Sequence, residues 1–214
     1  MQPASQASST GFKRVGGAVC LDFANTRANR DTEAPKEYLH SYADLVAWAG
    51  AVGVLSASAC QALLAAARAR PSEADETLAA ARKLREAIYG IFSRIATGEP
   101  APTPDLETLN AALARAMSRA RVAPQPGGGF GWAWAAEPDA LDPMLWAVAR
   151  SAAELLTSPL LDRVRECAGH PCGWLFLDMS RNRSRRWCDM RDCGNRAKAR
   201  RHYQRVRAAR AAPR

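Results

Sequence analysis

The sequence predicts a mainly α-helical α+β protein: a helical N-terminal domain with one small β-hairpin, followed by a treble-clef-like finger built on four cysteines. Three observations lead to this prediction. Alanine, the strongest helix former, supplies 45 of the 214 residues. Apolar residues recur at helical spacing through much of the chain before residue 160. Four of the six cysteines fall within 27 residues near the C-terminal end of the sequence.

Capping residues and prolines delimit the expected helices. Ser41, Ser58 and Ser72 are good N-cap residues. Pro71 stops the helix that begins at Ser58, and Ser72 begins the next one. The helices are predicted at 41–50, 58–69, 72–98, 103–117 and 142–156, with a short one at 158–165. The apolar segment 15–23 fits a strand or a helix equally well. The uncharged stretch 45–67 is long enough to span a membrane, but its glycines and polar residues favour two separate helices over a span.

A β-hairpin is predicted in the middle of the chain. Residues 119–123 and 130–135 flank the turn sequence PQPGGG, and the second segment alternates aromatic and small residues. This period of two places Phe130, Trp132 and Trp134 on one face of the hairpin.

The net charge of +9 is concentrated at one end. Residues 163–214 contain 15 Lys and Arg against 4 Asp and Glu, whereas the preceding residues contain 15 against 17. A near-neutral body with a basic tail favours a polyanionic partner, either nucleic acid or an anionic membrane. Together with the helix pattern, this asymmetry predicts a disordered lead-in at 1–11, an N-terminal domain at 12–160 and a basic finger at 161–214.

The clustered cysteines have the spacing of a metal site, Cys167-x4-Cys172-x15-Cys188-x4-Cys193. Structural zinc sites take four tetrahedral ligands, and two cysteine pairs separated by a hairpin's length can meet around one ion. The sequence shows no secretory signal, so we expect a cytoplasmic protein, in which such a cluster binds metal rather than forming disulfides. One structural Zn²⁺ is therefore predicted, with His170 as an alternative fourth ligand.

Between the cysteine pairs we expect a strand at 174–178, a turn at 180–184 and a returning strand at 185–187, followed by a helix at 196–210. Trp174, Phe176 and Trp187 are expected to form the small core of this finger. Its arginines are candidates for nucleic-acid binding, because the planar guanidinium binds phosphates and guanine edges bidentately. On the helix, two basic groups lie on opposite sides. The candidate residues are Arg181, Arg183, Arg185 and Arg186 in the turn, Arg196, Arg200 and Arg207 on one helix face, and Lys198 and Arg201 on the other.

These residues resemble a known family. The segment from Cys172 to Asp178, the turn that ends at Cys188 and above all Cys193-Gly-Asn-Arg196 look like the bacterial CGNR zinc finger. The N-terminal half, at 16–17, 21–26 and 45–48, is similar to the ABATE domain that precedes this finger in stress-induced transcription regulators. The resemblance implies a zinc site at the four cysteines, DNA binding and a role in transcription regulation under stress.

Other functions stay open at this point. A basic finger with aromatic residues is compatible with RNA binding, and a finger can also bind an acidic protein. An enzyme is not expected, because the N-terminal half contains only His40 and no phosphate loop, nucleophile elbow or HExxH motif. Asp22, Asn25 and Thr26 are candidates for a small-molecule effector site, although capping and turn hydrogen bonds are the favoured explanation for these three residues. A homodimer is possible, but no heptad pattern supports one.

Overall fold

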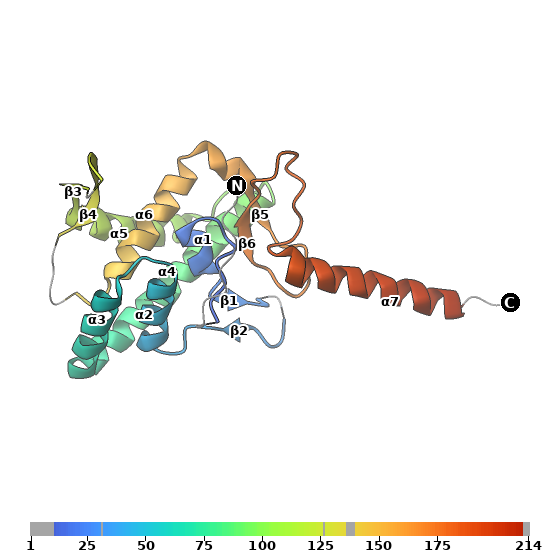
Figure 1. The fold of residues 1–214 in the computed structure, drawn as a ribbon, viewed down its shortest axis with the longest axis horizontal. Helices are drawn as coiled ribbons and strands as arrows, with labels where there is room; N and C mark the ends of the chain where they lie inside the picture. The colour runs from blue at the N-terminus through green and yellow to red at the C-terminus, as the bar shows by residue number, and fades with distance from the viewer. Residues whose placement is uncertain (1–10, 31, 126, 136–139, 212–214) are drawn as a thin grey trace.

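The computed structural model describes residues 11–30, 32–125, 127–135 and 140–211, and the side chains of the last helix up to Arg207. The predicted lead-in at 1–11 therefore lies outside the described residues, apart from Gly11. Figure 1 shows a helical body and, at its right, a finger from which a single long helix projects. Among the described residues, no helix combines the length and apolar character that a membrane span requires.

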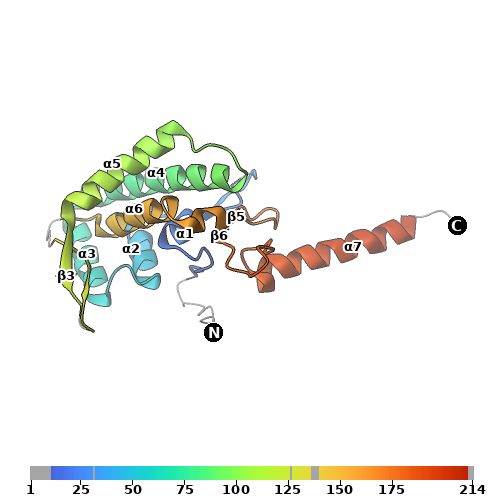
Figure 2. The ribbon, with the colours of Figure 1, turned by 90° about the horizontal axis from the view of Figure 1, so that it is seen from above.

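Six helices form the N-terminal body. They are α1 (Val19–Ala24), α2 (Tyr42–Ala51), α3 (Ala57–Ala69), α4 (Pro71–Ala96), α5 (Thr103–Arg119) and α6 (Pro143–Leu156). Helix α5 packs against both α4 and α6, and α1 also packs against both of these helices. Figure 2 shows α5 lying along α4. One continuous apolar core joins all six helices and reaches into the finger through Val164, Leu175 and Leu177.

Helix α1 resolves the ambiguity at 15–23. Five of its six residues are buried, from Cys20 to Ala24. A short helix that is buried on all sides has no polar face, so its sequence shows no helical period. The side chain of Asp22 accepts a hydrogen bond from the Gly16 N–H at 2.8 Å, which fixes the approach to the helix.

The helix starts agree only in part with the expected caps. The capping box of Ser41 and Asp44 is confirmed. The prediction was wrong at Ser58, because Ser56 caps α3 instead, and at Ser72, because α4 already begins at Pro71 with no side-chain cap. Proline at the first helical position needs no cap for a missing N–H, and its fixed φ suits the helix.

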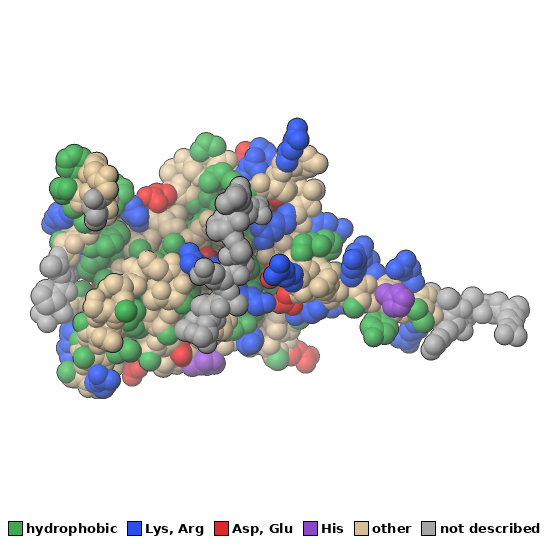
Figure 3. Space-filling model, in the orientation of Figure 1, with side chains coloured by type: hydrophobic (Ala, Val, Ile, Leu, Met, Phe, Trp, Pro, Cys, Tyr) green, Lys and Arg blue, Asp and Glu red, His purple; other side chains and the backbone are tan. Residues whose placement is uncertain are grey.

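The predicted hairpin is present as β3 (Ala120–Pro124) and β4 (Phe130–Trp134), with Val122 opposite Trp132. Its aromatic face meets the core only at the Trp134 end, where the ring lies edge-on to Trp146 at 5.8 Å. Phe130 and Trp132 are 77% and 51% exposed, and apolar side chains gather over this hairpin in Figure 3.

Two features of the body had no sequence signal. Strands β1 (Arg27–Ala28) and β2 (Lys36–Glu37) form a two-residue ladder. Beside them Arg85, only 2% exposed, donates two hydrogen bonds to the Glu37 carboxylate at 2.6 and 2.7 Å. Burial raises the pKa of Glu37, but the hydrogen bonds from Arg85 and from the backbone N–H groups of Leu39 and Tyr38, together with the charge of Arg85, outweigh it and leave the pKa below its usual value. This pair locks α4 to the β1–β2 ladder.

The finger begins with a 3-10 turn, η1 (Pro159–Arg163), and contains strands β5 (Val164–Glu166) and β6 (Leu175–Leu177). A π-helical turn, η2 (Met190–Gly194), leads into α7 (Asn195–Ala211). The expected pairing of the strand at 174–178 with 185–187 was wrong, because β6 pairs with β5 instead. Residues 185–187 are not in a strand.

The other edge of β6 explains this difference, because the N-terminal domain already occupies it. The Leu177 N–H donates to the Gly16 carbonyl at 2.8 Å. The Asn25 side chain binds both backbone groups of Leu175, accepting from its N–H and donating to its carbonyl, each at 2.8 Å. With both edges of β6 bonded, a returning strand has no hydrogen-bonding partner there.

We predict that Asn25→Ala lowers the free energy of unfolding by about 2–5 kcal/mol, because the buried N–H and carbonyl of Leu175 each lose their partner. Urea unfolding of the zinc-loaded chain measures this. The exposed Asn110 on α5 gives a matched control, and Asn110→Ala should change the stability by less than about 0.5 kcal/mol. Equal midpoints for the two variants would contradict the role assigned to Asn25.

Candidate metal centre

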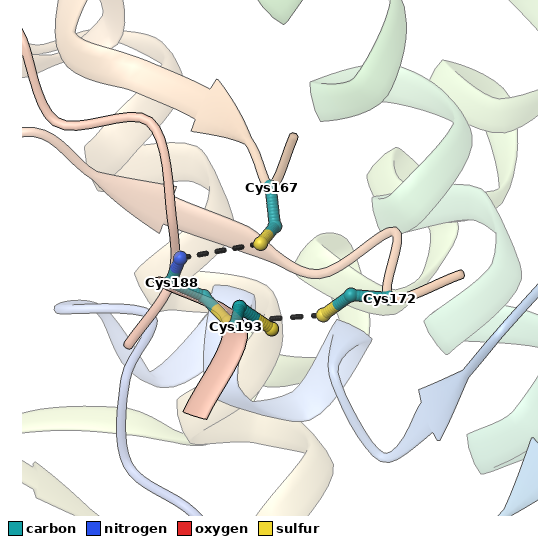
Figure 4. Close-up of side chains that lie close together, drawn as sticks. All are labelled: Cys167, Cys172, Cys188 and Cys193. Carbon is teal, nitrogen blue, oxygen red and sulfur yellow. Dashed lines mark hydrogen bonds between the residues drawn. The ribbon is translucent and has the colours of Figure 1, made fainter. Parts of the chain in front are cut away.

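Four separate segments of the finger bring the predicted ligands together. Cys167 follows β5, Cys172 lies in the turn before β6, Cys188 ends the long loop and Cys193 lies in η2 at the base of α7. Figure 4 shows these side chains converging on one point. Their sulfur atoms all lie within 4.8 Å of one another, and all four residues are buried.

The sulfur positions fit a tetrahedral metal ion. The Sγ atoms of Cys172 and Cys188 are 3.7 Å apart, and those of Cys188 and Cys193 are 3.6 Å apart. Four ligands about 2.3 Å from Zn²⁺ lie about 3.8 Å apart along the edges of the tetrahedron. Four protein ligands complete the coordination shell, so the ion is structural. His170, the expected alternative ligand, is exposed and is not part of the cluster.

Donors around the cluster stabilise negatively charged sulfur. The N–H groups of Gly169 and Cys188 donate to the Cys167 sulfur at 3.4 and 3.3 Å, and the Arg196 guanidinium donates to the Cys193 sulfur at 2.9 Å. Such outer contacts orient the ligands of a metal site. Gly169 is also required sterically, because a Cβ there would lie 2.9 Å from the Cβ of Cys193. Sequence reasoning passed over this glycine, although its place between two ligands was visible.

Without metal, the clustered sulfurs share protons unevenly. Hydrogen bonds from the Cys172 and Cys188 thiols lower the pKa of Cys167 to about 2. The same bonding to Cys167 raises the pKa of Cys172 to about 12 and raises that of Cys188 as well. Four thiolates held this close require a cation, which is the chemistry of a zinc site.

Comparison with known families agrees with this geometry. Residues 17–159, more than half of the chain, match the ABATE family, described as "Putative stress-induced transcription regulator". The chain belongs to the ABATE family. Its C-terminal part, residues 163–206, matches the CGNR zinc finger. No curated protein matches the chain. This member of the ABATE family thus carries a zinc finger whose four cysteines hold one zinc ion.

The predicted nucleic-acid contacts of this ABATE protein fall into two groups. Arg196 and Arg200 hydrogen-bond the finger itself, Arg200 through the His170 carbonyl at 2.9 Å, although both are also exposed. The other group is exposed, and its side chains make no hydrogen bond to the residues that the structure describes. It consists of Arg181, Arg183, Arg186, Lys198, Arg201 and Arg207.

Arg185 departs from the expectation that it belongs to an exposed basic turn. Its guanidinium donates to the carbonyls of Trp187 at 2.9 Å and of Cys188, and lies 4.4 Å from the centre of the Phe176 ring. The backbone N–H of Arg185 donates to Asp178, which also accepts from Ser180. Arg185 therefore holds the loop against the finger core, because its donors are directed inward.

The proposed effector residues lie in the interface between α1 and the finger. Asn25 is bonded to Leu175, and the Thr26 hydroxyl donates to the Phe23 carbonyl at 2.7 Å. Burial raises the pKa of Asp22 to about 6. The cavity that these three side chains help to line measures about 10 Å³, room for about one water molecule. An effector role for them stays a prediction, and it would require this interface to open.

Zinc binding should strengthen steeply as the pH rises. The thiols of Cys172 and Cys188 have raised pKa values and stay protonated in the metal-free cluster at neutral pH. Each must lose its proton to bind the ion, so the logarithm of the apparent zinc affinity should rise by at least about two per pH unit between pH 5 and 8. Competition with a chromophoric chelator across this range measures the slope. A pH-independent affinity would contradict the protonated thiols.

Proposed function

We propose that this protein is a DNA-binding transcription regulator in which the zinc finger fixes α7 as a basic arm. The observation that carries this proposal is the exposure of α7. Every residue from Lys198 to Arg207 is exposed, and Figures 1 and 2 show the helix projecting from the body along most of its length. Seventeen residues make a helix about 25 Å long.

The charges on α7 are placed for a groove rather than for a flat surface. Lys198 and Arg201 lie on the side of the helix opposite Arg207, as the 100° step per residue requires. The major groove of B-DNA is about 12 Å wide and admits a helix of about 10–12 Å diameter. A helix in this groove meets phosphates of both strands, which suits cations on both of its sides.

Duplex DNA fits this geometry better than duplex RNA. The major groove of A-form RNA is deep and narrow, and side chains cannot read it. Single-stranded RNA is bound mainly by stacking on aromatic rings, and the described side chains of α7 offer only two exposed rings of that kind, Tyr203, at 73% exposure, and His202. Competition between duplex DNA and a structured RNA for the zinc-loaded protein tests this preference.

A sensing role of the N-terminal domain forms part of the proposal. Asn25 and Gly16 bind β6 directly, and Asn29 donates its N–H to the Cys172 carbonyl at 3.1 Å. A ligand or partner that displaced α1 or the β1–β2 ladder would therefore act on a metal-ligating turn. This connection supports a regulator in which the state of the ABATE domain reaches the finger through hydrogen bonds.

We predict that Lys198→Gln combined with Arg207→Gln lowers the slope of log affinity against log salt by about 1.8, since each lost phosphate contact removes about 0.9 from B-DNA binding. Fluorescence anisotropy with a random duplex over a salt series measures this slope. The two residues lie on opposite sides of α7, so a change of only about 0.9 would place one side away from the DNA.

The matched control removes two exposed arginines from the N-terminal domain, Arg68→Gln with Arg121→Gln. It lowers the net charge equally and should leave the slope unchanged. Identical losses in both double variants would show a non-specific effect of net charge. No binding to duplex DNA at low salt would overturn the proposal and favour a finger that binds protein.

A further inference from the structure

A basic pocket lies between the first cysteine turn and the base of α7. Its volume is about 200 Å³. Three segments line it: the turn at 168–170, the loop at 186–187, and the segment that runs from Cys193 through the first two turns of α7. Four arginines contribute to its wall, namely Arg186, Arg196, Arg200 and Arg201, and no Asp or Glu does so among the described residues.

Hydrogen bonds between the three segments give this pocket a fixed shape. The Ala168 N–H donates to the Arg186 carbonyl at 2.9 Å, which joins the turn to the loop. Arg200 donates to the His170 carbonyl at 2.9 Å, which joins the turn to α7. Gly169 lets the turn approach Cys193 more closely than any side chain would permit. The metal centre and the pocket wall are therefore built from the same turn.

The arginines carry more positive charge than the metal centre needs. Zinc bound by four thiolates has a net charge of −2, and Asp192, 3.4 Å from Arg196, contributes one more negative charge. Arg196 alone contacts a cysteine sulfur. The guanidinium of Arg186 lies against the Trp187 ring, 5.7 Å from its centre, and Arg201 is exposed. Most of the five N–H donors of each guanidinium remain available to a ligand.

We infer that this pocket binds a phosphate group, and that in the complex the group is a backbone phosphate of the bound nucleic acid. The inference rests on the proposed function and adds to it a fixed point of contact. Arginine forks bind phosphate oxygens in pairs, and a concave wall supplied by several arginines holds the group in one position. A phosphate seated at the base of α7 sets the register of the arm along the groove.

The test uses amide NMR spectra of the zinc-loaded full chain titrated with inorganic phosphate, against chloride at the same ionic strength. Saturable shifts at the Gly169 amide with phosphate alone are expected. Arg186→Gln with Arg201→Gln should weaken phosphate binding at least about tenfold, while the Arg200 contact to the turn is kept. Arg68→Gln with Arg121→Gln serves as the control and should bind phosphate normally. Equal responses to chloride and phosphate, or unchanged phosphate binding in the Arg186→Gln, Arg201→Gln variant, would overturn the assignment of this pocket as a phosphate site.

Addition of a 12-base-pair duplex then identifies the source of the phosphate. If a backbone phosphate fills the pocket, saturating duplex abolishes the response of Gly169 to inorganic phosphate. Simultaneous binding of both would overturn the backbone source and leave a site for a free phosphate compound. Duplex binding with a normal salt slope but no response to phosphate would overturn the pocket and leave the proposed DNA function standing. A phosphate response without duplex binding would overturn the proposed DNA function and the backbone source, and would leave a site for a free phosphate compound.

Discussion

Strand β6 is hydrogen-bonded along both edges, and the arrangement of the whole molecule depends on this. On one side it pairs with β5, and on the other it binds Gly16 and the Asn25 side chain of the N-terminal domain. A two-stranded hairpin of three-residue strands is not stable alone. The apolar side chains of β6 join the two parts in the same way. Leu175 and Leu177 belong to the core of the helical body, whereas Phe176 packs with the four cysteines. The two family regions thus share one strand and form a single packed unit.

This sharing gives the arginines of the finger different tasks. Some stabilise the fold: Arg185 binds loop carbonyls, and Arg196 offsets the charge of a metal-ligating sulfur. Others, such as Lys198 and Arg207, are exposed along α7. The angular position of each residue around the helix, which is all that the sequence provides, does not distinguish these two kinds of cation. Only the contacts separate those that maintain the finger from those available to a polyanion.

Local patterns predicted what depends on neighbours in sequence. The capping box of Ser41, the break between α2 and α3, the β3–β4 hairpin and the cysteine cluster could all be read this way, since each is set within a few residues or by ligand chemistry. The partner of β6 could not be predicted. It depends on Asn25, 150 residues away, whose side chain takes the place of a strand. The buried pair of Arg85 and Glu37 could not be predicted either. A charged residue on a helix normally indicates an exposed face, so nothing in the sequence indicates that Arg85 is buried.

The projecting helix separates the residues that recognise a partner from the residues that stabilise the fold. Beyond Arg200, the α7 side chains up to Arg207 are exposed and make no hydrogen bond to the finger among the described contacts. Substitutions there cost the folded body almost nothing, provided that they preserve helix propensity. Mutation can therefore change what the arm recognises without a compensating change in the core. Related chains could diverge in target while the metal centre and the ABATE helices stay the same.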